Sequence, residues 1–318
     1  MRYTRRDFGR LALGALPAAA LMRRPAAVFA ATRPDSVING VHLGTITYSY
    51  RSMPDQSAEA ILRYVLDSGI SAIEFMGGPV EAFAGAPQMP RGTFGRGAPT
   101  PDQQAAQREV AQKLRAWRAS ASMDRFKALR RMFNDAGVTI YAWKQLAPEM
   151  SDAEMEYVFN VAESLGCTHT TLELVDDAAQ LKRIGAFAEK HKVYAAYHTH
   201  LQGSMTAFDQ AFAASRHNMA NVDLGHYVAA GGDPIQFLNK FHDRVASFHL
   251  KDRQTPAHGA GNLAWGTGDT PIRGILQLVK KNKWTMPATI ELEYDVPTGS
   301  DAVKEVVKCL GYCREALA

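Results

Sequence analysis

Short apolar runs alternate along the chain with longer segments in which apolar residues recur every three or four positions. The runs predict β-strands, and the longer segments predict helices with one face in a core. The predicted strands cover residues 42–50, 70–76, 138–143, 168–174, 193–198, 220–224, 244–250 and 288–292. The predicted helices cover residues 58–67, 102–136 with a break near 120–122, 152–165, 178–191, 205–216, 234–241, 271–281 and 302–316.

Helix-start signals support several of these boundaries. Ser151 with Glu154 three residues later predicts a capping box, in which each side chain bonds the backbone N–H of the other residue. Asp233 precedes a proline, a favoured pair for the cap and the first helical position. Two connections, residues 77–101 and 251–269, are rich in glycine and too long for plain links. Long loops in compact domains are often functional.

Eight predicted strand–helix pairs follow one another with no low-complexity linker between them. Alternating pairs are typical of a parallel sheet, and eight of them close into a (β/α)8 barrel of about 250 residues. Residues 31–318 have the length of one such domain. We therefore predict the α/β class and a single (β/α)8 TIM barrel, in which the carboxyl ends of the strands form the active face.

The first 30 residues have the order of an export signal. Residues 4–8 read Thr-Arg-Arg-Asp-Phe, an apolar run covers 11–21, and residues 28–30 form a small-residue cleavage site. We predict a twin-arginine signal peptide at residues 1–30 and a periplasmic or otherwise exported mature protein. The alternative is a basic amphipathic helix. No later run approaches the ~20 apolar residues that a membrane span needs.

The formal net charge of +4 comes from this leader. It holds six of the 36 basic residues and one of the 32 acidic residues, which leaves 30 and 31 in the mature chain. A near-neutral chain gives no support for binding to nucleic acid. The three cysteines are Cys167, Cys309 and Cys313. The last two lie four residues apart, which suits neighbours on one helix face better than a disulfide framework.

Polar residues lie at the ends of four consecutive predicted strands: His198, Asp223, His249 and Glu291. Because the parallel strands of a barrel end at one face, we expect the four side chains to form one site. A single polar strand end is more often a cap or a surface residue, but buried acidic residues are rare unless they are paired or bind a metal. Two imidazoles and two carboxylates suit Mn²⁺, Zn²⁺, Co²⁺ or Fe²⁺ better than Ca²⁺.

Further polar residues follow these positions or end the neighbouring strands. We predict His200, Lys144 and Glu173 as catalytic groups, with His200 as the base because an imidazole pKa of about 6.5 suits proton abstraction. The residues predicted to contact substrate are His226, Lys251, Asp252, Glu293, Trp143 and Trp265. Each has a plainer alternative: a solvated lysine, a structural partner of a ligand, or a tryptophan in the core.

Four segments carry a resemblance to a known family: residues 197–200 (Tyr-His-Thr-His), 223–226 (Asp-Leu-Gly-His), 248–252 (Phe-His-Leu-Lys-Asp) and 290–293 (Ile-Glu-Leu-Glu). Together they resemble the xylose-isomerase-like barrel superfamily of sugar isomerases and epimerases, which also contains endonuclease IV. The resemblance covers essentially the whole mature chain. In relatives a glutamate commonly ends the fifth strand, where this chain has His198, and Glu173 is the substitute for that ligand.

The resemblance implies a divalent metal, often Mn²⁺, that chelates adjacent oxygens of a carbonyl sugar. It also implies a base that removes the proton beside the carbonyl and a metal-stabilised enediolate, which isomerases, epimerases and lyases share. Exported relatives with paired histidines on the fifth strand look like enzymes of keto-glycosides. The reaction outcome and the oligomeric state stay open, and the expected partner is a small carbohydrate.

Two other functions fit parts of the pattern. An endonuclease IV-like nuclease would use extra histidine ligands on the second and third strands, which here end in Glu74 and Lys144. A non-catalytic periplasmic protein that binds a sugar or a metal would need the ligands alone. The surplus of titratable residues around the predicted metal favours chemistry over binding alone.

Overall fold

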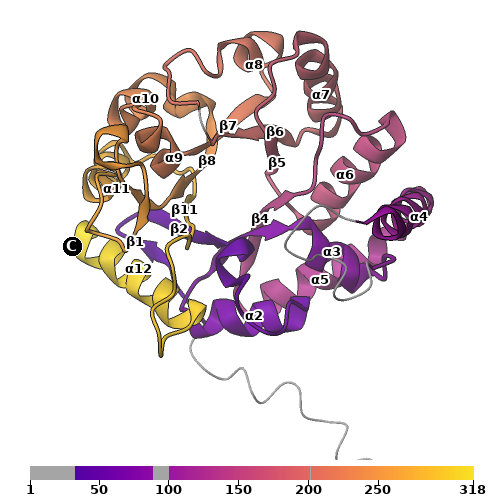
Figure 1. Cartoon of the computed structure of the whole chain (residues 1–318), viewed down its shortest axis with the longest axis horizontal. Helices are drawn as coiled ribbons and strands as arrows, with labels where there is room; N and C mark the ends of the chain where they lie inside the picture. The colour runs from indigo at the N-terminus through magenta and orange to yellow at the C-terminus, as the bar shows by residue number, and fades with distance from the viewer. Residues whose placement is uncertain (1–32, 89–99, 201) are drawn as a thin grey trace, which may run out of the picture. The chain divides into compact units, whose positions relative to one another are not determined.

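Eight parallel strands form a closed ring at the centre of the barrel (Figure 1). The computed structural model describes residues 33–88, 100–200 and 202–318. Strands β2 to β8 pair in chain order, and β11 pairs with both β8 and β2, which closes the ring. The barrel strands are β2 (Val41–Ile46), β3 (Ala72–Met76), β4 (Thr139–Lys144), β5 (His169–Glu173), β6 (Tyr194–His198), β7 (Asn218–Asp223), β8 (Val245–Leu250) and β11 (Ala288–Ile290).

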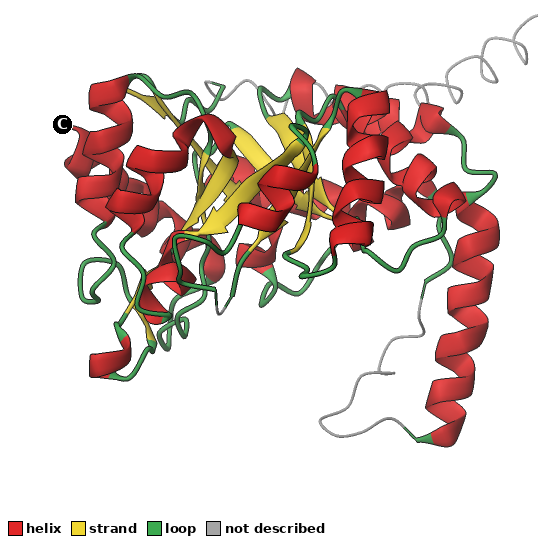
Figure 2. Cartoon of the chain, turned by 90° about the horizontal axis from the view of Figure 1, so that it is seen from above, coloured by secondary structure: helices red, strands yellow, loops and turns green. Residues whose placement is uncertain are grey.

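Helices surround this ring, and the side view also places the strands inside them (Figure 2). They are α2 (Ala58–Asp67), α3 (Gly77–Ala84), α4 (Pro101–Arg118), α5 (Met123–Asp135), α6 (Asp152–Leu165), α7 (Ala178–His191), α8 (Asp209–Ala214), α9 (Leu224–Ala229), α10 (Pro234–Phe241), α11 (Ile272–Asn282) and α12 (Ala302–Leu317). The predicted (β/α)8 barrel is therefore confirmed. Within the described ranges, no helix has both the length and the apolar character to cross a membrane.

Shorter elements complete the barrel. Strand β1 (Val37–Ile38) pairs antiparallel with β2, and β9 (Asp252–Arg253) pairs with β10 (Asn262–Leu263) inside the connection from β8 to α11. The 3-10 turns are η1 (Thr47–Tyr50), η2 (His242–Arg244) and η3 (Pro256–His258). The second predicted long loop, residues 251–269, thus carries a small hairpin of its own.

Helix boundaries follow the local sequence signals in most places. Ser151 and Glu154 make the predicted capping box, and α6 ends at Gly166, whose φ of 77° is left-handed and favours glycine. Asp233 caps α10 through hydrogen bonds from two backbone N–H groups. The predicted break near residues 120–122 separates α4 from α5.

Four stretches differ from the prediction, and one of them is α9, where no helix is predicted. The first predicted strand stops at Ile46, and residues 47–50 form η1, where the Thr47 hydroxyl accepts a hydrogen bond from the Met76 N–H of β3. Residues 77–84 of the first predicted loop form α3, and the predicted helix 205–216 shortens to α8. Residues 1–30, where the signal peptide is predicted, lie outside the described residues.

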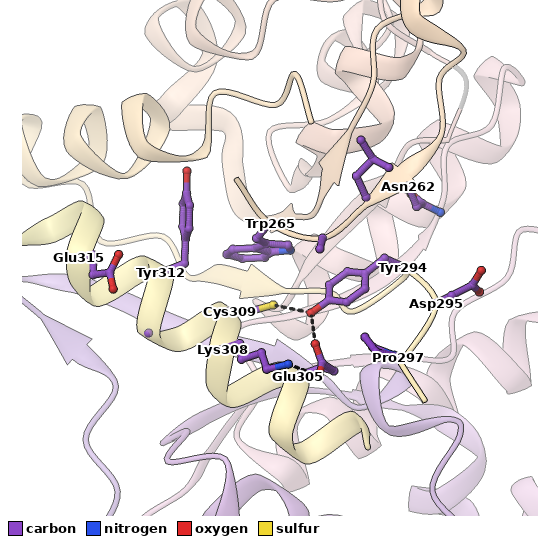
Figure 3. A pocket seen from close by; sticks show the side chains of 13 residues that line it. Asn262, Trp265, Tyr294, Asp295, Pro297, Glu305, Lys308, Cys309, Tyr312 and Glu315 are labelled. Atoms are coloured by element: carbon purple, nitrogen blue, oxygen red, sulfur yellow. Dashed lines mark hydrogen bonds and ion pairs between the residues drawn. The ribbon is translucent and has the colours of Figure 1, made fainter. Parts of the chain in front are cut away.

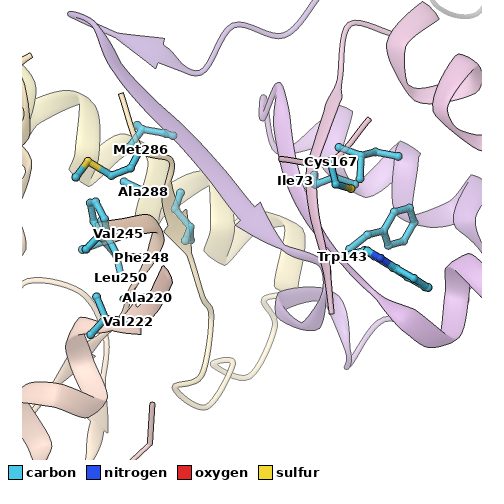
Figure 4. Packing of buried hydrophobic residues seen from close by; sticks show 14 of the residues in the cluster. Ile73, Trp143, Cys167, Ala220, Val222, Val245, Phe248, Leu250, Met286 and Ala288 are labelled. Atoms are coloured by element: carbon cyan, nitrogen blue, oxygen red, sulfur yellow. The ribbon is translucent and has the colours of Figure 1, made fainter. Parts of the chain in front are cut away.

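The apolar core lies between the strands and the helices. Figure 4 shows Phe248 and Leu250 of β8 gathered with Val222 of β7 and Ala288 of β11. Successive side chains of a strand point to opposite faces, so His249, between Phe248 and Leu250, points into the barrel. The alternation in this strand therefore places one face in the core and the other at the barrel axis.

Trp143 belongs to this core, which corrects its prediction as a substrate contact. Its side chain is fully buried and packs edge-to-face against Tyr157 of α6, with ring centroids 6.4 Å apart. Lys144, the next residue on β4, points the other way and reaches the rim of the barrel. A sugar at the active face cannot contact Trp143 from there.

Hydrogen bonds across the barrel show that its interior is polar. Tyr141 of β4 bonds Thr289 of β11 at 2.7 Å, and His169 of β5 bonds Ser247 of β8 at 2.8 Å. These strands are not neighbours in the sheet, so the bonds cross the barrel axis. Because buried polar groups need partners, this layer of hydrogen-bonded side chains favours one arrangement of the barrel interior. It forms a hydrogen-bonded floor beneath the candidate site.

Candidate active site

Strands β6, β7, β8 and β11 deliver the four predicted metal ligands to one place. His198, Asp223, His249 and Glu291 are all buried, and one ligand atom from each lies within 4.8 Å of the others. His198 and Asp223 are the last residues of β6 and β7, His249 is the penultimate residue of β8, and Glu291 follows β11 directly. The structure therefore brings together the set that the strand ends predict.

Distances identify the atoms that converge. Nδ1 of His249 lies 2.9 Å from Oε2 of Glu291 and 3.8 Å from Oδ2 of Asp223. Nε2 of His198 lies 4.0 Å from the same Asp223 oxygen. The cluster thus presents two imidazole nitrogens and two carboxylate oxygens, a mixed set that suits a divalent transition metal.

Asp223 uses its two carboxylate oxygens differently. Its Oδ1 accepts a hydrogen bond of 2.7 Å from the His226 N–H and so caps α9. Its Oδ2 is buried and faces the other candidate ligands, and it pairs with Nζ of Lys251 at a distance of 2.9 Å. Burial raises the pKa of Asp223. One lysine faces several buried carboxylates here, and a bound divalent cation would supply further positive charge between Asp223 and Glu291, so these residues fit a metal.

The Lys251 ammonium lies against the same carboxylates. It is 2.9 Å from Asp223, 2.9 Å from Glu291 and 2.7 Å from Glu293, and the side chain is 2% exposed. Gly225 gives it room, because a Cβ there would lie 2.2 Å from Cγ of Lys251. Lys251 therefore offsets part of the negative charge of the site. Its predicted contact with substrate stays a prediction.

Glu74 of β3 lies beneath the ligands and is fully buried. It accepts hydrogen bonds from Nε2 of His249 at 2.8 Å, from the Thr171 hydroxyl at 2.8 Å and from the Asn221 amide at 3.3 Å. Burial alone would raise the pKa of Glu74, but the facing His249 lowers it to about 2. Sequence reasoning assigned no role to Glu74, although an acidic residue in an otherwise apolar strand was a signal for one.

The two ligand histidines differ in charge when no metal is bound. Burial would lower the pKa of His249, but the carboxylates of Glu74 and Glu291 raise it to about 10. Burial lowers the pKa of His198 to about 3, helped by the positive Lys144 and His249. A metal must therefore displace a proton from His249, whereas His198 is already neutral.

The three predicted catalytic residues form a second cluster on the rim. Nδ1 of His200 lies 2.8 Å from one oxygen of Glu173, and Nζ of Lys144 lies 2.8 Å from the other. The His200 and Glu173 side chains are half exposed, at 49% and 50%. The His200 ring centroid is 4.9 Å from that of the ligand His198. The structure thus places three titratable side chains beside the candidate metal ligands.

The charges of the rim cluster shift the pKa values of His200 and Glu173. The hydrogen bond to Glu173 raises the pKa of His200 above its usual value. Burial would raise the pKa of Glu173, but His200 and Lys144 lower it to about 2. Both oxygens of Glu173 are taken by these partners, and Glu173 is not among the four converging ligands. The geometry therefore favours His198 over Glu173 as the ligand.

His226 lies close to His200 of the rim cluster and to Glu293. Its ring centroid lies 4.6 Å from that of His200, and its Nε2 lies 3.7 Å from Glu293. Its Nδ1 contacts the Arg253 guanidinium. Burial, with the positive charges of Lys251 and Arg253, lowers the pKa of His226 to about 2. A neutral imidazole at this position can exchange hydrogen bonds with a substrate hydroxyl.

Comparison with known proteins agrees with this geometry. The model of the xylose isomerase-like TIM barrel family matches residues 62–313. The chain belongs to this family. Inosose dehydratase of Clostridium tetani (strain Massachusetts / E88) is 25% identical over 170 residues, 47% of this chain and 56% of that protein. The chain therefore spans just over half the length of this curated relative.

Solved structures of the same fold belong to several sugar enzymes. A xylose isomerase domain protein from Planctomyces limnophilus superposes with a TM-score of 0.58 at 16% identity, over 87% of this chain and 96% of that one. The 3-keto-D-glucoside 4-epimerase of E. coli superposes with a TM-score of 0.58 at 9% identity, over 86% and 99%. At such identities the likeness shows the fold alone. The function of this xylose isomerase-like barrel therefore has to be inferred from the side chains of its own site.

Asp252 corrects its prediction as a substrate contact. One oxygen accepts backbone N–H bonds from Gly266, Thr267 and Gly268, and the other accepts one from Thr270. All four donors lie in the connection from β8 to α11. Asp252 therefore orders this loop of the xylose isomerase-like barrel, and its side chain is buried there.

Trp265 lies on the outside of the barrel, by helix α12. It packs edge-to-face against Tyr312 with ring centroids 6.0 Å apart, and it lines a cavity of about 720 Å³ with Tyr294 (Figure 3). None of the four candidate ligands lines this cavity. The structure thus places Trp265 in a cavity apart from the four candidate ligands.

Proposed function

We propose that this protein is a divalent-metal-dependent enzyme that isomerises, epimerises or cleaves a carbonyl sugar or keto-glycoside. The observation that carries the proposal is the buried set of two histidines and two carboxylates with an acid–base cluster beside it. Membership of a family whose relatives include a dehydratase and an epimerase of such molecules supports it. Mn²⁺ is the expected metal, and Zn²⁺, Co²⁺ or Fe²⁺ fit the same ligands.

The four ligands would hold the ion through Nε2 of His198, Nδ1 of His249 and one oxygen each of Asp223 and Glu291. A divalent ion there polarises neighbouring oxygens of a bound sugar. The floor of hydrogen bonds keeps the ligand side chains in place before substrate arrives, which lowers the reorganisation needed during the reaction.

His200 is the proposed base. In its neutral form it takes the proton from the carbon next to the carbonyl, and the Glu173 carboxylate stabilises the imidazolium that results. Lys144 keeps Glu173 ionised and supplies a proton donor on the same rim. Return of the proton to carbon gives isomerisation or epimerisation. Departure of a protonated group from the β-carbon gives elimination.

The test combines metal analysis with proton exchange. The purified protein should contain a stoichiometric divalent metal, and keto-sugars or keto-glycosides in D₂O should gain deuterium or lose a β-substituent by NMR. His200→Ala should abolish both signals and keep the metal. His42→Ala is the matched control, because His42 is exposed at the amino end of β2. Turnover without either signal, such as plain hydrolysis, would rule out this mechanism.

A non-catalytic periplasmic binding protein is the competing function. The same screen separates the two, because a binding protein would shift sugar resonances without converting the sugar. A nuclease is disfavoured by the near-neutral mature chain, and β3 and β4 end with no histidine.

Export is part of the proposal. Arg5 and Arg6 precede the apolar run of the leader, so replacing both with lysine should leave full-length precursor in the cytoplasm. Mature protein in the periplasm of that strain would overturn it.

A further inference from the structure

We infer that Glu74, a single buried carboxylate, fixes which ring nitrogen of both histidine ligands faces the metal. It reaches His249 directly and His198 through the side-chain amide of Asn221. This role of Glu74 rests on the metal site of the proposed function, and it is the same whichever reaction occurs there. It is a positioning residue, because it acts on the ligands and not on substrate.

The direct path follows from the chemistry of a carboxylate. An ionised carboxylate can accept hydrogen bonds but cannot donate them. Oε2 of Glu74 lies 2.8 Å from Nε2 of His249, so that nitrogen must carry a proton. Nδ1 is then the only nitrogen of His249 that can bind a metal, and it faces Asp223 and Glu291.

The indirect path passes through Asn221. Its amide nitrogen lies 3.3 Å from Oε2 of Glu74 and 2.6 Å from the Ser247 hydroxyl. Because Glu74 requires a donor, the NH₂ group must face it, and the amide oxygen must face His198. That oxygen lies 2.9 Å from Nδ1 of His198. Nδ1 therefore carries the proton, and Nε2 presents its lone pair to the cluster.

A chain of hydrogen bonds under the site agrees with this orientation of the Asn221 amide. Ser247 accepts from Asn221, so its own proton goes to Nε2 of His169 at 2.8 Å. Nδ1 of His169 then donates to the Thr168 hydroxyl at 2.8 Å, and that hydroxyl donates to the backbone oxygen of Tyr141 at 3.1 Å. Every donor in the chain meets an acceptor, and the reverse direction would place an amide oxygen against the carboxylate.

The two histidines thus bind the metal through different nitrogens, Nδ1 for His249 and Nε2 for His198. This pattern can be measured by two-bond ¹H–¹⁵N NMR of protein with ¹⁵N-labelled histidine. Zn²⁺ is the probe, because it is diamagnetic. In the metal-free protein, His198 should show a protonated Nδ1, and His249 should show protons on both nitrogens, because Nε2 faces Glu74 and Nδ1 faces Glu291. With Zn²⁺, His198 should be bound through Nε2, and His249 should be bound through Nδ1 and keep its proton on Nε2.

Three variants separate the two paths. Glu74→Gln should keep both patterns, because its amide oxygen can accept from His249 and Asn221 while its NH₂ group faces the Thr171 hydroxyl. Glu74→Leu should lose both patterns and weaken Zn²⁺ binding about 10–100-fold. Asn221→Leu should lose the pattern of His198 and keep that of His249.

Several outcomes would overturn the inference. The first is that Glu74→Leu leaves the protonation patterns of both histidines and the Zn²⁺ affinity unchanged. The second is that Glu74→Gln loses these patterns as fully as Glu74→Leu does. The third is that Asn221→Leu disturbs both histidines equally. If Glu74→Leu does not fold, as judged by circular dichroism, the other two variants decide. Absence of Zn²⁺ binding to the wild type would count against the proposed function, whereas the metal-free spectra would still decide the role of Glu74.

Discussion

Replacing Lys251 with methionine should destabilise the metal-free protein strongly and the metal-loaded protein much less. The Lys251 ammonium lies within 2.9 Å of Asp223, Glu291 and Glu293. Two of these carboxylates are proposed ligands, so a bound divalent cation would provide the positive charge that the variant lacks. Methionine keeps an unbranched apolar stem and removes the charge.

The size of the effect follows from the burial of the group. Removing one partner of a buried ion pair costs about 3–5 kcal/mol, because the other charge stays buried without compensation. We expect the loss to remain in this range despite three carboxylates, since some of them will bind protons in the variant. Asp223 is the first candidate, because burial already raises its pKa. At about 2–4 °C per kcal/mol, Tm of the metal-free protein should fall by about 6–20 °C.

Thermal melts followed by circular dichroism, with chelator and with saturating Mn²⁺, test this. The metal should raise Tm of Lys251→Met more than Tm of the wild type, because it no longer competes with an ammonium group. Lys304→Met is the control: Lys304 is 63% exposed and pairs with Asp301, and such surface pairs contribute about 0–1 kcal/mol. An unchanged Tm in chelator, or equal stabilisation by metal in variant and wild type, would refute the reasoning.

Three further predictions concern the ligands and the base. His249→Ala and Asp223→Ala should each lose stoichiometric metal, measured by elemental analysis, with the circular dichroism spectrum of the barrel retained. His198→Ala should weaken metal binding in titration calorimetry more than Glu173→Ala, and the reverse order would move the site one strand back. Because Glu173 raises the pKa of His200 and only the neutral imidazole accepts a proton, kcat/KM should rise with pH through a value above about 6.5. In Glu173→Gln that rise should shift to lower pH, and an unshifted profile would exclude His200 as the base.

The periodic pattern predicted the barrel and its ligand set because both depend on local signals. Strand ends of a closed parallel sheet meet at one face, so a polar residue at the end of each strand needed no further information to be placed. His198 and Asp223 are examples, and the capping box of Ser151 is another local signal that the structure confirms.

The predictions failed where the two buried faces of a strand or contacts distant in the chain decide the role of a residue. Trp143 was assigned to the substrate although its neighbour Lys144 points to the rim, and adjacent residues of a strand cannot both do so. The partners of Asp252 lie 14 to 18 residues further along the chain, and no periodicity reports such a loop. Glu74 was missed for a related reason, since its partners come from three other strands.

The bond from Glu74 to His249 spans 175 residues and joins β3 to β8. Contacts of such long sequence separation require the intervening chain to be ordered, and they are slow to form during folding. A folding intermediate with only β5 to β11 in place would carry all four ligands, yet Nε2 of its His249 would lack its carboxylate partner. Metal affinity during refolding should therefore be low at first and rise when the N-terminal strands dock. The time course of metal binding would then follow the closure of the barrel.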